Sequence, residues 1–136
     1  MRTTMKYLAA LFVMVTFVGC GEETTEDIIE RVNSTGSITD EQAESLSKVE
    51  GYLVLNGLTS LTDEQAESLS KVQTLVLNGL TSITDEQAES LSKVEGYLYL
   101  TGLTSITDEQ AESLSWVTKL YISEDLQPLI DKYKNQ

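Results

Sequence analysis

The chain of 136 residues has no histidine, one cysteine, one proline and only nine basic residues. Without histidine it has no Ser-His-Asp or Cys-His catalytic set and no imidazole ligand for zinc or haem. A single cysteine cannot form a disulfide within the chain, so packing must stabilise the fold. The sequence also holds no GxGxxG motif and no phosphate-binding loop. We therefore predict a protein that is not an enzyme and that uses no metal or other cofactor.

The shortage of basic residues leaves a strongly acidic chain, with 22 Asp and Glu residues and a formal net charge of −13. Arg2 and Lys6 precede Cys20, so residues 20–136 hold seven basic and 22 acidic residues, a net charge of −15. Such a surface repels nucleic acid and anionic lipid head groups. We expect no nucleic-acid partner, and any contact with a membrane must come from a lipid.

Residues 1–19 have the features of an export signal. Arg2 and Lys6 are followed by the apolar run Leu8–Val18, which is too short to cross a bilayer as a stable helix. The run is therefore interpreted as a secretory signal that is removed from the mature chain.

The only cysteine, Cys20, directly follows Phe17-Val18-Gly19 and precedes the polar residues 21–24. This arrangement resembles a bacterial lipobox, whose cysteine receives a lipid after cleavage. The resemblance implies lipidation at Cys20 and a protein anchored at the outer membrane or cell surface of a bacterium. The alternative, a lone buried cysteine, fits poorly because Cys20 lies between an apolar run and a polar stretch.

The dominant positive feature is the block TDEQAESLS, which occurs four times. It begins at Thr39, Thr62, Thr84 and Thr107, with spacings of 23, 22 and 23 residues. A period of this size indicates stacked supersecondary units, each of which cannot bury its apolar face alone. Four units exceed the roughly three that such a stack needs.

Each block predicts a short helix. Thr84 is a natural N-cap, and Gln87 stands three residues later at capping-box spacing. Ala88 and Leu91 form a narrow apolar stripe, and Lys93 is expected in the last turn, where the helix dipole favours a cation. A helix of about ten residues is marginal by itself, so it must pack on a neighbouring element.

The letters between the blocks predict a strand. Leu75 and Leu77 alternate with other residues and are expected to face inward, and Gly79 permits a sharp turn after the strand. The equivalent inward pairs are Leu53 and Leu55, Leu98 and Leu100, and Leu120 and Ile122. The Asn-Gly pairs at 56–57 and 78–79 are also hairpin signals, which leaves an antiparallel hairpin as the competing fold. The apolar letters after each glycine do not alternate, which disfavours the hairpin.

The series Val72-x-x-Leu75-x-Leu77-x-x-Leu80-x-x-Ile83 resembles the leucine-rich repeat family, and the resemblance covers about residues 38–122. It implies an α/β leucine-rich-repeat-like solenoid of about four repeats, with a parallel β-sheet on one face, short helices on the other, and terminal caps. It also implies recognition of a partner, without naming a ligand. The usual asparagine position holds Leu58, Leu80 and Leu103, so the asparagine ladder of the family is absent.

The expected organisation has four parts: a signal peptide at 1–19, a lipid-anchored tether and N-terminal cap at 20–37, the solenoid at 38–122, and a C-terminal cap helix at 123–136. Trp116 stands where the other units hold lysine, and we expect the C-terminal helix to cover it. Two finished ends predict a monomer.

The acidic residues recur identically in every block, so we interpret them as a solvated helix face. Loose calcium binding by these ladders is the alternative, although the sequence has no dense Asp/Asn/Gly loop of a dedicated calcium site.

The letters that vary between units fall on the outward face of the strands, where parallel strands about 4.8 Å apart should gather them into one surface. Exposed tyrosines favour binding, because they offer large contact area and lose little rotamer entropy. The simpler alternative is that tyrosine and valine only stabilise the sheet. The predicted partner contacts are Tyr52, Val76, Tyr97, Tyr99, Lys119 and Tyr121.

These patterns together predict a membrane-anchored surface lipoprotein whose sheet face binds a protein or a glycan. The alternative function is a passive envelope coat with no specific ligand, in which the acidic helices keep surfaces hydrated and apart.

Overall fold

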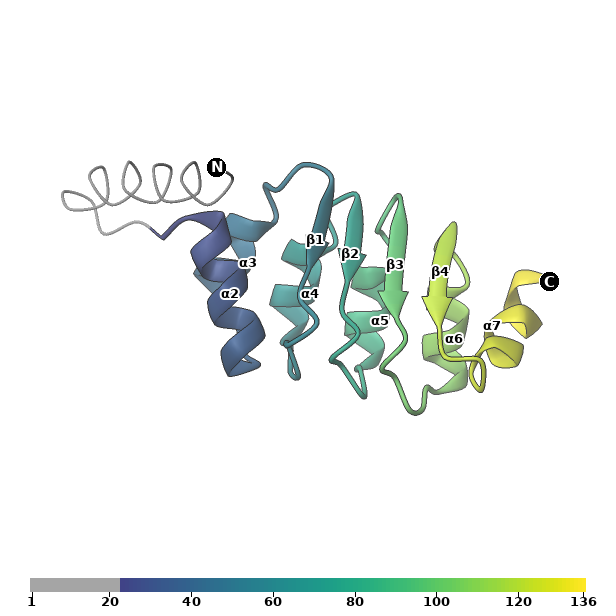
Figure 1. The fold of residues 1–136 in the computed structure, drawn as a ribbon. Helices are drawn as coiled ribbons and strands as arrows, with labels where there is room; N and C mark the ends of the chain where they lie inside the picture. Colours follow the sequence, from purple (N-terminus) through teal and green to yellow (C-terminus); the bar gives the residue numbers. More distant parts are fainter. Residues whose placement is uncertain (1–22) are drawn as a thin grey trace, which may run out of the picture.

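The computed structural model describes residues 23–136, which fold as a row of α/β units (Figure 1). Four short helices alternate with four short strands, and one further helix lies at each end. In chain order the elements are α2 (Thr25–Thr35), α3 (Asp40–Leu46), β1 (Tyr52–Val54), α4 (Asp63–Leu69), β2 (Thr74–Val76), α5 (Asp85–Leu91), β3 (Tyr97–Leu100), α6 (Asp108–Leu114), β4 (Lys119–Ile122) and α7 (Gln127–Lys134).

The four strands form one parallel sheet whose spatial order, β1-β2-β3-β4, is the chain order. Helices α3 to α6 line the other side of the row, and each packs against the next (Figure 1). The register keeps equivalent letters side by side, so that Leu53, Leu75, Leu98 and Leu120 are Cα partners across the sheet. The parallel pairing excludes the antiparallel hairpin.

The repeated block forms its helix as predicted, through a complete capping box in every unit. In α5 the Thr84 side chain accepts a hydrogen bond from the Gln87 N–H, while the Gln87 side chain accepts one from the Thr84 N–H. The predicted length was wrong, because each helix has seven residues and ends at its leucine. Lys93 therefore lies one residue beyond the C-cap Ser92 and not in the last turn of the helix.

The core lies between the two layers and is built from the inward strand residues and from the alanine and leucine of each helix. Leu75, Leu77, Ala88 and Leu91 are fully buried, as are their equivalents in the inner units. In residues 23–136 the core forms one cluster that extends from Ile28 to Ile130.

The glycines after the strands are needed for a reason that differs from the predicted one. Gly79 does not have a positive φ, so glycine is not needed there for a left-handed backbone conformation. A Cβ at Gly79 would lie 2.3 Å from the Asn56 carbonyl oxygen, and one at Gly57 would lie 2.0 Å from the Asn33 carbonyl oxygen. Successive turns therefore stack so closely that only glycine fits.

The capping glutamines also join neighbouring units, a role that the spacing within one unit does not predict. Gln65 is buried and its Nε2 donates to the Ile38 carbonyl oxygen at 2.8 Å and to Asp40 Oδ1 at 3.0 Å. Two units further along the chain, Gln110 Nε2 donates the same two hydrogen bonds, to the Ile83 carbonyl oxygen and to Asp85 Oδ1. Each glutamine thus caps its own helix and satisfies the carbonyl at the start of the preceding helix, which holds the units in register.

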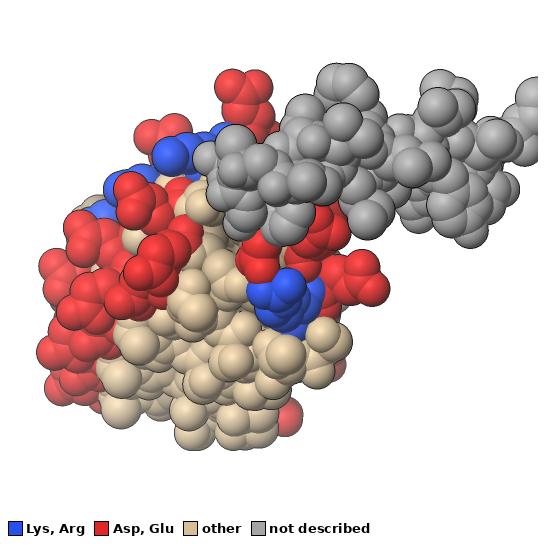
Figure 2. Space-filling model, turned by 90° about the vertical axis from the view of Figure 1, so that its left-hand side faces the viewer, with Lys and Arg blue, Asp and Glu red and all other residues tan. Residues whose placement is uncertain are grey.

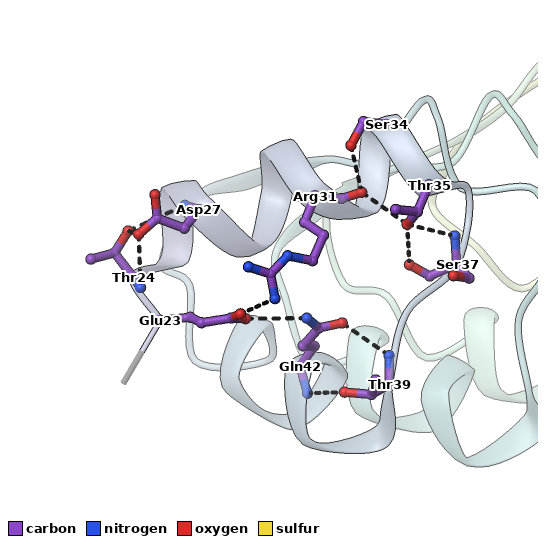
Figure 3. Close-up of polar contacts among 9 residues, drawn as sticks. All are labelled: Glu23, Thr24, Asp27, Arg31, Ser34, Thr35, Ser37, Thr39 and Gln42. Atoms are coloured by element: carbon purple, nitrogen blue, oxygen red, sulfur yellow. Dashed lines mark hydrogen bonds and ion pairs between the residues drawn. The ribbon is translucent and has the colours of Figure 1, made fainter. Parts of the chain in front are cut away.

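The N-terminal end is closed by α2, whose Ile28 and Val32 enter the core as predicted. Figure 3 shows Glu23 reaching between α2 and α3, where its carboxylate pairs with Arg31 and accepts a hydrogen bond from Gln42 Nε2 at 3.2 Å. The Asn33 side chain accepts from the Gly57 N–H at 2.8 Å and so joins α2 to the turn after β1.

At the other end α7 packs against α6 and buries Ile130. Lys132 lies 3.7 Å from Asp108 and pairs with it. The expectation that this helix covers Trp116 was wrong, because the Trp116 side chain is 78% exposed. The helix is only eight residues long and covers the end of the helix layer, while Trp116 lies in the turn between α6 and β4.

Candidate binding face

The outward side of the sheet presents two rows of side chains that cross all four strands. Strand register places Tyr52, Thr74, Tyr97 and Lys119 in one row, and Val54, Val76, Tyr99 and Tyr121 in the other. This arrangement follows from strand alternation, because the leucines between these positions point into the core. The letters that vary between units are therefore side by side on one surface.

Three tyrosines form a stacked cluster at the β3–β4 side of this face. The Tyr99 and Tyr121 rings have centroids 4.5 Å apart and planes within 6° of each other. The Tyr97 ring lies 6.4 Å from Tyr99 and 6.2 Å from Tyr121, also nearly parallel. Aromatic pairs in this range add about 0.5–1.5 kcal/mol beyond their buried area, so the cluster is held in place before any partner arrives.

Lys119 completes the cluster as its single cation. Its Nζ lies 4.4 Å from the Tyr97 ring centroid and donates a hydrogen bond to the Tyr97 hydroxyl at 2.8 Å. That hydrogen bond, followed by the electrostatic influence of the same phenol, raises the pKa of Lys119 above its ordinary value. An ammonium has three donors, so two remain to reach a partner.

Of the other two predicted contacts, Tyr52 lies apart from the cluster and Val76 lies beside it. Tyr52 is 74% exposed on β1, two strands away from Tyr97, and stacks on none of the described aromatic rings. Val76 lies on β2 directly beside Tyr99 and is half-buried. The structure thus brings Val76, Tyr97, Tyr99, Lys119 and Tyr121 together and leaves Tyr52 at the far edge.

The chemical groups of this face are mainly aromatic and aliphatic. It offers apolar ring surface, phenolic hydroxyls and one ammonium group, and no carboxylate belongs to the two rows. Within residues 23–136 no group of three acidic or cysteine side chains is placed to hold a metal ion. The acidic side chains instead gather along the helix side of the row, which Figure 2 shows from the α2 end.

Two features of the described chain were not recognised from the sequence as surface or joining elements. Trp116 is the most exposed large apolar side chain there, and only its departure from the lysine of the other units marks it in the sequence. The buried glutamines were recognised as caps, but the sequence of a single unit contains no pattern that predicts a hydrogen bond to the next unit.

The predicted lipidation residue, Cys20, lies outside the described residues. In the part that is described, none of the helices combines the length and apolar character needed to cross a bilayer.

Comparisons with protein-family models, with curated proteins and with solved structures gave no significant match.

Proposed function

We propose that residues 38–122 form a leucine-rich-repeat-like solenoid that recognises a protein or a glycan through the tyrosine-bearing sheet face. The observation that carries this proposal is the cluster of Tyr97, Tyr99, Tyr121 and Lys119, in which three near-parallel rings and a cation occupy outward strand positions. Support for the solenoid comes from the repeat period and from the parallel strands lying in chain order.

The cluster has the composition of a recognition surface. Tyrosine supplies contact area and a hydroxyl at a small entropic cost, and an ordered cluster loses even less freedom when a partner binds. Tyr121 is 45% exposed although its ring stacks on Tyr99, so it retains surface for a partner. If Tyr121 served only to stabilise the sheet, its ring would not need to remain this exposed.

A binding assay with matched variants tests this function. A soluble form that begins at Gly21 keeps Glu23 and every core residue, and it can be applied to glycan and peptide arrays. We expect saturable binding that Tyr97→Ala combined with Tyr99→Ala abolishes, with circular dichroism nearly unchanged and the melting temperature lowered only by the lost ring stacking. Tyr52→Ala, which removes an equally large ring outside the cluster, should weaken binding much less. Normal binding by the double variant would rule out the cluster as the site.

The second candidate is the passive coat, and the acidic helix side favours it (Figure 2). This function requires charge and no particular tyrosine. Neutralising the repeated helix carboxylates, for example Glu41, Glu64, Glu86 and Glu109 to Gln, should then change the envelope phenotype, while the double tyrosine variant should not. Under the recognition function we expect the reverse.

Anchoring at the outer membrane or cell surface is part of the same proposal. Its support is the export signal and the position of Cys20, only five residues before the start of α2, which would hold the row of units close to the membrane. Labelling of cells with a fatty-acid analogue should mark the protein and not its Cys20→Ala variant. Protease access on intact cells then distinguishes the outer from the inner leaflet.

A further inference from the structure

Trp116 is an exposed apolar side chain at a position that holds lysine in the other three units. The equivalent residues of the other units are Lys48, Lys71 and Lys93. Trp116 is 78% exposed and lies at a shallow hollow of about 390 Å³. The hollow is lined by Ser115, Trp116, Val117, Thr118, Tyr133, Lys134 and Gln136. Tryptophan is the residue most typical of binding hot spots, and a solvated lysine position is an unfavourable place for it in a free monomer.

The hollow belongs to an end of the molecule that is incompletely covered. Leu120 is only half-buried, whereas its partners Leu53, Leu75 and Leu98 are fully buried. The N–H groups of Leu55 and Leu77 donate to the following strand at 2.9 Å. Ile122 is the corresponding residue of β4, which is the edge strand of the sheet formed by residues 23–136. At this edge of the described sheet Leu120 therefore keeps apolar surface that its equivalents on the other strands bury.

The charge distribution also separates this end from the rest. Residues 23–118 contain four basic and 18 acidic residues, a net charge of −14. Residues 119–136 contain three of each and are neutral. At physiological ionic strength the screening length is about 8 Å, so two copies repel one another strongly unless their acidic parts stay apart. The C-terminal end is the surface through which two copies can meet with the least repulsion.

We propose that this end binds a second copy of the chain, through a two-fold contact in which Trp116 of each copy enters the hollow of the other. The indole and the hollow belong to the same surface, which is what a two-fold interface requires.

This contact goes beyond the proposed function and does not involve the tyrosine face. It replaces the monomer that was predicted from two finished ends, because that prediction depended on α7 covering Trp116. It also leaves the α2 ends at the two outer ends of the pair.

Trp116 is the only tryptophan of the chain, so its fluorescence reports the contact directly. For the form that begins at Gly21, sedimentation should show a shift from monomer to dimer as concentration rises. Trp116 emission should shift to the blue and resist quenching over the same concentration range.

Trp116→Lys restores the residue of the other units on an exposed site, so its circular dichroism should stay unchanged. We expect it to weaken dimerisation by at least about 30-fold.

A second variant separates a specific contact from general stickiness. Trp116→Lys combined with Lys93→Trp keeps one exposed indole but moves it one unit along the row. We expect this variant to be monomeric. A single monomer mass at all concentrations, dimers of Trp116→Lys, or equal dimerisation by the double variant would each overturn the proposal, whatever the array experiment shows for the tyrosine face.

Discussion

The two ends of the row are built differently, although the units between them are nearly identical. At the N-terminal end α2 begins with a Thr24–Asp27 capping box and ends with Gly36 in a left-handed conformation. At the C-terminal end α7 has no side-chain cap. The α2 end contacts the first unit through close backbone approach and hydrogen bonds, whereas the α7 end leaves Trp116 exposed and Leu120 half-buried.

The difference between the α2 end and the α7 end shows which interactions replace a neighbouring unit where the row of units ends. Inner units are joined by the glutamine bonds and by the glycine turns, and the N-terminal end imitates both with Glu23 and Asn33. In the last repeated helix of residues 23–136, Asp108 pairs with Lys132 rather than with a glutamine of another unit. The glycine position of the last unit is occupied by Glu124, which is exposed.

The largest effect is expected at the closed end. Gly57→Ala places a Cβ against the Asn33 backbone, which cannot move without displacing α2, and should cost about 3 kcal/mol. Glu124→Ala, at the equivalent position of the open end, should change the unfolding free energy by no more than about 0.5 kcal/mol. Urea unfolding of both variants measures the contrast, and equal costs would show that the two ends do not differ in packing.

The glutamine bonds come next. Gln65→Ala leaves the Ile38 carbonyl without its donor in a buried position, and we expect a loss of about 1–3 kcal/mol. Gln42→Ala removes the same cap but only a partly exposed bond to Glu23, so about 1 kcal/mol should be lost. The difference between the two measures what the link between inner units adds to the cap. A Gln65→Ala variant as stable as Gln42→Ala would argue against that link.

A smaller effect is expected for the ion pair that ends the row. Lys132 and Asp108 both remain more than half exposed, so Lys132→Ala should destabilise the protein only slightly, and the difference should vanish at high salt. Melting curves in low and high salt test this. A loss that persists in high salt would mean that Lys132 acts by packing rather than by charge.

The smallest effect concerns Lys119, the cation of the candidate binding face. The Tyr97 hydroxyl raises the pKa of Lys119 above 10.5, so Tyr97→Phe should lower it toward that value. Because the pKa is raised in the folded state, the associated stabilisation is complete below the ordinary lysine pKa and is lost as pH rises through the raised value. Nuclear magnetic resonance titration of the Lys119 side chain measures the change. An unaltered pKa in Tyr97→Phe would place the cause elsewhere.

Much of the fold could be predicted because its signals are local. The capping box lies within four residues, and the alternation of Leu75 and Leu77 fixes which strand side is buried, so both predictions are confirmed. Helix length was overestimated because the apolar spacing continues to Val94 after the helix has ended at Leu91. Val94 is buried, so the pattern reported burial correctly but not the backbone conformation.

The candidate face was predictable in outline for the same reason. Strand alternation identified the outward letters, and the register confirmed that they share one surface. The separation of Tyr52 from the cluster could not be predicted, because it depends on which strands are neighbours and on rotamers that the rings adopt against each other. The prediction that α7 covers Trp116 was wrong because the way α7 packs on α6 has no counterpart in the repeated units, from which it could have been inferred.

The sequence by itself determined the repeated unit: its capped helix, its short strand and the face that each buries. These properties follow from interactions among residues that are close along the chain. Only the tertiary structure decided which glutamine meets which carbonyl, why the turns require glycine, and that one end stays open beside Trp116. Those features arise from distances between units, and such distances exist only after the units have packed together.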